Sequence, residues 1–194
     1  MHYNNRGELM NERAGLYVGI IAVLAFAVLA LVIYSSTAIV GEYKASDYSS
    51  RMLEVKRVWQ NARFVLDKTV SEALADYVIV RYSSTGSCSN NVNNAEAENR
   101  VKTYIENTLS GISAELGTIS CTLENFTYAI PAGLQPNQPR IEASVKCSLD
   151  TGELKIDYEK EAVFEKEVNV NTAAGCEVTV VDRQSNEIDI TQSA

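Results

Sequence analysis

The sequence has very little histidine, and its few cysteines lie far apart. The single histidine is His2, and none of the four cysteines is part of a Cys-x-x-Cys pair. A zinc site needs about four clustered imidazole, thiolate or carboxylate ligands, so we predict no metal site and no cofactor. The sequence after His2 also has no histidine to activate a serine or cysteine nucleophile. We therefore expect a protein that is not an enzyme.

Basic residues are outnumbered by acidic ones. The chain carries 25 Asp and Glu residues against 17 Lys and Arg residues, a formal net charge of −8 at pH 7. A negative surface repels the phosphate backbone, so this balance argues against a nucleic-acid partner.

Charge is absent altogether from one long stretch near the N-terminus. No charged residue occurs from Ala14 to Val40, where Leu, Ile, Val, Ala and Phe dominate. A helix of about 20 such residues crosses the hydrocarbon core of a bilayer. The run is too long for the apolar core of an ordinary secretory signal. We therefore predict a polar tail at 1–13, a transmembrane helix at 14–40, and a single-pass protein whose first partner is the lipid bilayer.

All four cysteines follow this predicted membrane segment. They are Cys88, Cys121, Cys147 and Cys176. An even number of scattered cysteines predicts disulfides and an oxidising compartment, and Asn125-Phe126-Thr127 adds an N-glycosylation acceptor pattern. The Lys and Arg residues that flank the segment favour the opposite orientation, but long domains are translocated regardless of charge. We therefore expect the C-terminal domain to be extracytoplasmic, at the cell membrane or in an extracellular filament.

The first half of the chain has the pattern of helices. The three prolines all lie in 131–139, and proline breaks helix interiors. Apolar residues recur every three or four positions within an amphipathic helix predicted at 41–82. They are Met52, Val55, Trp59, Ala62, Leu66, Val70, Ala73, Tyr77 and Val80. This stripe predicts a helix face that packs on a sheet, with a coiled-coil partner as the alternative. With the apolar run before it, this pattern predicts a near-continuous helix from about Asn11 to Tyr82.

A second helix and a sheet are predicted in the domain at 83–194. Asn93 and Glu96 resemble a capping pair, and Gly117 follows the last apolar position, which predicts a helix at 93–116. From 118 to 191 the period changes to two, which predicts five or six antiparallel strands with one packed face. The fold class is therefore α+β: a long N-terminal helix, a second helix and an antiparallel sheet.

The first two strands allow a specific register to be predicted. Alternation in the first strand slips once at Glu124-Asn125, which indicates a one-residue bulge. Pairing Tyr128 with Ile141 then places Leu123 opposite Val145, and Cys121 opposite Cys147. A disulfide between these two cysteines is one of three possible partnerships of Cys121, and the other two remain open.

The N-terminal tail carries a motif that suggests processing. Arg6-Gly7 precedes Glu8, and Glu12 would be the fifth residue of a chain that begins at Glu8. With the order of helices and strands, these residues resemble a type IV pilin, most nearly the archaeal kind. The resemblance implies a leader at 1–7 that a prepilin peptidase removes between Gly7 and Glu8, an apolar helix in a filament core, and a role for Glu12 in assembly.

A simpler interpretation of the tail uses only helix and membrane physics. Asn11 would cap the helix, the carboxylate of Glu12 would be favoured in its first turn, and the Arg13 side chain would extend to the lipid head groups.

One further triplet, Asp150-Thr151-Gly152, matches the motif of aspartic proteases, where two carboxylates share a proton. Asp-x-Gly between two strands is also ordinary turn chemistry, which we prefer.

Three functional hypotheses follow. The preferred one is a structural subunit of a surface filament or envelope assembly that associates with itself or with other subunits. The alternative is a monomeric, anchored, extracytoplasmic binding domain, and an aspartic-type protease is the most distant possibility.

Overall fold

The structure is a computed structural model that describes the backbone of residues 6–173 and 175–194. Its side chains are described at 28–29 and at 47–194, except at 174. The chain forms two compact units, Met1–Ser49 and Ser50–Ala194. Helix α1 (Arg6–Thr85) contributes to both units and continues through Gly41.

The membrane segment predicted at 14–40 falls in the first unit. Its side chains lie outside the described residues, apart from those of Val28 and Leu29. Among the residues that the structure describes in full, no helix is long and apolar enough to cross a membrane.

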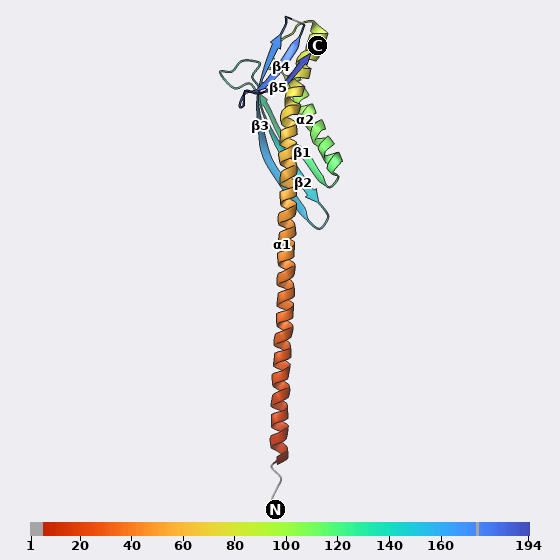
Figure 1. The fold of residues 1–194 in the computed structure, drawn as a ribbon, viewed down its shortest axis with the longest axis vertical. Helices are drawn as coiled ribbons and strands as arrows, with labels where there is room; N and C mark the ends of the chain where they lie inside the picture. Colours follow the sequence, from red (N-terminus) through yellow and green to blue (C-terminus); the bar gives the residue numbers. More distant parts are fainter. Residues whose placement is uncertain (1–5, 174) are drawn as a thin grey trace, which may run out of the picture. The chain divides into compact units, whose positions relative to one another are not determined.

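The second unit is an α+β domain with two helices on an antiparallel sheet (Figure 1). The second part of α1 and helix α2 (Ala95–Leu116) are linked through their side chains, since the hydroxyls of Thr69 and Thr108 lie 3.3 Å apart. Trp59 of α1 donates a hydrogen bond of 3.0 Å to the carbonyl of Val145 in the sheet. The fold class is therefore confirmed for this unit.

The apolar stripe of α1 is the face that packs into this domain. Its members from Val55 to Tyr77 are buried in the core, and Met52 is partly buried. Val80, which the spacing placed on the stripe, is 41% exposed, and Val78 is buried in its place. The stripe is covered by the same chain, so the coiled-coil alternative for this face is wrong.

The N-cap of helix α2 lies one residue later than predicted. The side chain of Asn94, not of Asn93, accepts hydrogen bonds from the backbone N–H groups of Glu96 and Ala97. These two hydrogen bonds satisfy backbone N–H groups that have no carbonyl partner within the helix. The helix ends at Leu116, as predicted, and Gly117 caps it with a φ of 66° that favours glycine.

The sheet has five strands in the order β1-β2-β3-β4-β5, all antiparallel. The strands are β1 (Ile119–Ala129), β2 (Arg140–Asp150), β3 (Lys155–Asn171), β4 (Glu177–Asp182) and β5 (Ile188–Ser193). The predicted register of β1 and β2 is confirmed, including the irregularity between Leu123 and Asn125 and the pairing of Tyr128 with Ile141.

Strand β3 is one long strand, so the sheet has five of the five or six predicted strands. Its first part, up to Glu165, pairs with β2, and its second part, from Lys166, pairs with β4 on the other edge. The proline loop continues the first edge, because the N–H of Lys166 donates to the carbonyl of Pro139 and that of Val168 to the carbonyl of Asn137. Lys166 therefore lies where the strand changes partner.

Two disulfides bind the domain together. Cys121 in β1 is bonded to Cys147 in β2, directly opposite in the register, and Cys88 is bonded to Cys176, the residue before β4. The expectation of disulfides is confirmed, and the first pairing is the one that the strand register suggested. Disulfides persist in oxidising compartments, so they indicate an extracellular or secreted domain.

Candidate functional site

The most unusual polar group in the described part of the chain is the side chain of Lys166. It lies on the inner face of β3, between the buried residues Phe164 and Val168, and is 0% exposed. A buried ammonium is costly unless it is paired and hydrogen-bonded, so its partners define the site.

Three carboxylates from three different elements surround this ammonium. The Nζ atom of Lys166 lies 2.7 Å from Oδ1 of Asp67 in α1, 2.7 Å from Oδ2 of Asp189 in β5, and 3.1 Å from Oδ2 of Asp182 at the end of β4. The hydroxyl of Ser71, one turn after Asp67 on α1, donates a 2.8 Å hydrogen bond to Oδ2 of Asp189. We refer to these five residues as the lysine cluster.

The turn between β4 and β5 fixes the position of Asp182. Its Oδ1 atom accepts hydrogen bonds from the backbone N–H groups of Gln184 and Ser185, at 2.8 and 2.9 Å. Asn186 then takes a positive φ of 59°, which asparagine tolerates better than most residues. The local sequence Asp-Arg-Gln-Ser-Asn therefore forms a turn that holds one carboxylate oxygen and leaves the other for Lys166.

The electrostatics of the lysine cluster keep its central groups ionised. Burial alone would lower the pKa of Lys166, but hydrogen bonds to Asp189 and Asp67 more than offset burial and raise it. Burial alone would raise the pKa of Asp182. The hydrogen bonds from the backbone N–H of Ser185 and from the Lys166 ammonium have the larger effect, and the pKa of Asp182 is lowered. Three carboxylates around one ammonium leave a formal charge of −2.

The three carboxylates are close enough to be considered as metal ligands. One oxygen from each of Asp67, Asp182 and Asp189 lies within 4.8 Å of the others. The Lys166 ammonium lies within hydrogen-bond distance of all three and supplies the positive charge that a metal ion would bring. An ammonium has three N–H donors, and these three contacts use all of them. The cluster is arranged as a clamp between α1 and the sheet, not as a nucleophile or a metal centre.

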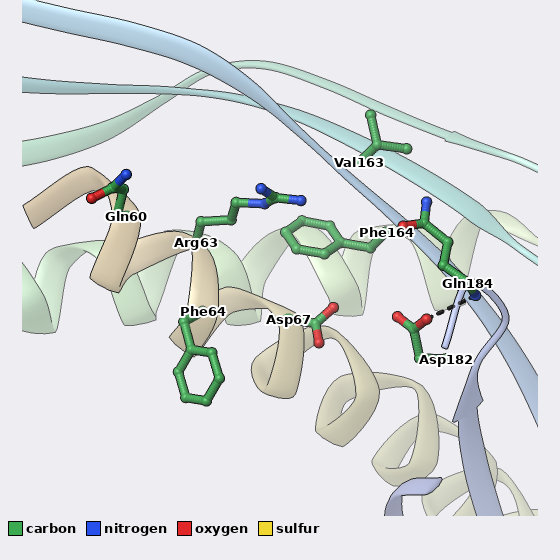
Figure 2. Close-up of a pocket in the computed structure, with 8 residues that line it drawn as sticks. All are labelled: Gln60, Arg63, Phe64, Asp67, Val163, Phe164, Asp182 and Gln184. Atoms are coloured by element: carbon green, nitrogen blue, oxygen red, sulfur yellow. Dashed lines mark hydrogen bonds between the residues drawn. The ribbon is translucent and has the colours of Figure 1, made fainter. Parts of the chain in front are cut away.

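An open pocket of about 300 Å³ lies beside the lysine cluster (Figure 2). Its lining comes from α1, β3 and the end of β4: Gln60, Arg63, Phe64, Asp67, Val163, Phe164, Asp182 and Gln184. Figure 2 shows the Arg63 side chain extending toward Phe164, whereas the Phe64 ring points away from the other lining residues. Phe64 is 82% exposed, which is unusual for an aromatic side chain.

The residues predicted for processing and assembly are Arg6, Gly7, Glu8 and Glu12, and their side chains lie outside the described residues. Asn125 lies at the bulge of β1 and is exposed.

Asp150-Thr151-Gly152 forms a turn between β2 and β3. The N–H of Gly152 donates a 2.9 Å hydrogen bond to Oδ1 of Asp150, and Gly152 has a φ of 81°. The triplet is therefore the Asx-type turn that we preferred to a protease motif.

The lysine cluster was missed by the sequence analysis, although one signal was present. The inner face of β3 consists of every second residue, and two lysines, Lys160 and Lys166, stand in this mainly apolar series. Lys160 is exposed and lies over the ring of Trp59, whereas Lys166 is buried and therefore needs acidic partners. Their positions on α1, β4 and β5 depend on the tertiary fold.

Comparison with known proteins finds no match. No family model, no curated protein and no solved structure is significantly similar to this chain.

Proposed function

We propose that the protein is a membrane-anchored structural subunit of a surface filament or a similar envelope assembly. The apolar segment at 14–40 anchors or polymerises, and the disulfide-bonded domain lies outside the cytoplasm. The observation that carries this proposal is the joining of two features in one helix. An uncharged run of 27 residues in α1 is followed by a face that is buried on an antiparallel sheet.

The tail supports the same proposal. A basic residue and a glycine precede Glu8, and Glu12 would follow the new amino terminus by four residues. In a packed bundle of apolar helices, a carboxylate is stabilised by a positive partner, and the amino terminus of a neighbouring subunit would supply one. The resemblance to archaeal pilin-like proteins rests on these residues.

The lysine cluster suits a structural role. Its ammonium has all three donors engaged, and its contacts join α1 to strands β3, β4 and β5. Ion pairs of this kind fix the position of one element against another. A subunit that transmits load between its helix and its domain needs such a fixed connection.

Substitutions in the tail test the proposal. In the native host, we expect a Gly7→Leu substitution to block processing and a Glu12→Ala substitution to prevent filament formation. Glu8→Gln is the matched control, because it removes a carboxylate from the same tail but leaves the fifth position intact. The readout is the amount of protein in the filament fraction sheared from cells.

Two results would contradict the proposal. One is wild-type protein that never enters the sheared fraction. The other is an unchanged amount of sheared protein in both the Gly7→Leu and Glu12→Ala strains. Either result would favour the anchored binding domain, which tolerates both changes.

A further inference from the structure

The outward face of α1 between Leu53 and Lys68 is basic and partly apolar. Leu53, Arg57, Phe64 and Lys68 follow one another at intervals of four, seven and four residues, which places them on one side of the helix, opposite the buried stripe. Leu53 is 56% exposed and Phe64 is 82% exposed. We call the surface formed by these four residues the helix face.

The charges of the helix face are not neutralised within the domain. In the part of the chain that the structure describes, neither Arg57 nor Lys68 lies within ion-pair distance of a carboxylate, and neither do the nearby cations Lys56 and Arg63. These cations are solvent-exposed and available to a partner.

The outer face of the sheet has the opposite charge. Every second residue of β3 faces away from the helices, and this row contains five acidic side chains. They are Asp157, Glu159, Glu161, Glu165 and Glu167. We call them the sheet face.

Only part of the sheet face is neutralised by its own strands. Lys146 pairs with Asp157, and Arg140 pairs with Glu165. Among the described ion pairs, none involves Glu159, Glu161 or Glu167. The sheet face therefore keeps unpaired negative charge.

The two faces cannot neutralise each other within one chain. The buried stripe of α1 packs on the inner side of the sheet, so the helix face and the sheet face are turned outward in opposite directions. Two copies that met through identical helix faces would bring like charges together, which opposes association. The same holds for two sheet faces. A helix face against the sheet face of another copy is the arrangement with complementary charge.

We propose that copies of this chain dock by placing the helix face of one copy on the sheet face of the next. The occupant of each face is a second copy, because this chain itself carries the complementary surface. Such a contact joins two different surfaces, so each copy keeps one free face of each kind, and the contact propagates as an open chain unless it closes into a ring. The inference rests on the proposed filament function and names the surfaces that the subunits use.

Charge reversal of each face provides the test. The helix variant is Arg57→Glu/Lys68→Glu, and the sheet variant is Glu159→Lys/Glu161→Lys. The matched control, Glu106→Lys/Glu115→Lys, makes the same charge change as the sheet variant on the exposed side of α2. Full-length chains in detergent are compared by sedimentation at several salt concentrations, after circular dichroism has shown that each variant is folded.

We expect each variant alone to associate at least about tenfold more weakly than the wild type. Each surface ion pair changes the association constant by a factor of roughly two to five. Reversal of two charges replaces two attractions by two repulsions. The control should associate like the wild type. Association of the wild type should weaken as salt rises from about 0.05 M to 0.5 M, because exposed charges are screened.

An equimolar mixture of the helix variant and the sheet variant distinguishes this contact from others. In the mixture, a reversed helix face meets a reversed sheet face, and the unreversed faces meet each other, so association should return. If both variants associate like the wild type, or if the mixture remains as weak as its components, the docking proposal is wrong and the filament proposal stands. If the wild type does not associate at any salt concentration, the docking proposal is wrong, and the sheared fraction described above decides the filament proposal.

Discussion

The replacement of Lys166 by methionine tests the lysine cluster most sharply. Methionine fills a similar volume but removes the ammonium that, among the described side chains, contacts the carboxylates of Asp67, Asp182 and Asp189. Removing one partner of a buried ion pair costs about 3–5 kcal/mol. Because the Asp67 side chain is 40% exposed and its charge is partly screened, we expect the lower end, about 3 kcal/mol at pH 7.

Urea unfolding of the full-length chain, with disulfides intact, measures this change. Trp59 is the only tryptophan, it is 3% exposed, and its ring N–H is bonded to a sheet carbonyl, so its fluorescence reports unfolding of the domain. The control is Lys102→Met on α2, where the side chain is 49% exposed and lies 4.0 Å from Glu106. In this control, the free energy of unfolding should fall by no more than about 0.5 kcal/mol. A loss below about 1 kcal/mol in Lys166→Met would refute the argument that the cluster clamps the fold.

Lys166→Met should make stability depend on pH between about pH 4 and 7, where the wild-type contributions of Asp182 and Lys166 are both fully present. In the wild type, the pKa of Asp182 is lower in the folded state than in the unfolded state. Its contribution to the free energy of unfolding is therefore present above the unfolded pKa of about 4, and it is lost as pH falls through the folded pKa. The pKa of Lys166 is raised, so its contribution is present below the unfolded pKa of about 10.5 and is lost as pH rises through the folded pKa. Without the ammonium, the carboxylates repel one another, and the variant should lose stability as pH rises from about 4 to 7.

Further predictions concern the disulfides, the helix cap and the cluster itself. In the chain-entropy account, replacing both cysteines of the Cys88 disulfide by serine should lower the free energy of unfolding by about 4–5 kcal/mol. The corresponding change at the Cys121 disulfide should cost about 3–4 kcal/mol, because the sequence separations are 88 and 26 residues. Asn94→Ala should cost about 1–2 kcal/mol in urea unfolding, because it removes the cap of α2 and the 2.7 Å hydrogen bond to Tyr77. Lys166→Met/Asp189→Asn should be more stable than Lys166→Met, since it removes one of the three uncompensated carboxylates.

The parts of the fold that the sequence predicts are those with a local period. The stripe of α1 has a step of three or four residues, and β1 and β2 alternate, so local pattern alone placed Trp59 in the core and Cys121 opposite Cys147. The bulge was predictable because a slip in alternation has one simple cause, an extra residue in one strand.

The parts that sequence reasoning missed depend on which elements meet. Lys166 is one of two lysines on the inner face of β3, and its three acidic partners come from positions up to 99 residues away in sequence. The change of partner at Glu165 and Lys166 is set by the turn before β4 and by the proline loop, neither of which alters the alternation within β3. The cap of α2 was placed one residue early because Asn93 and Asn94 are adjacent and equally suited to that role.

N-terminal sequencing of the protein in filaments sheared from the native cell surface is the most direct test of the proposed function. We predict that the chain is present in this fraction and begins at Glu8, after removal of residues 1–7. A chain that begins at Met1 or His2 and stays in the membrane fraction as a monomer would contradict the account.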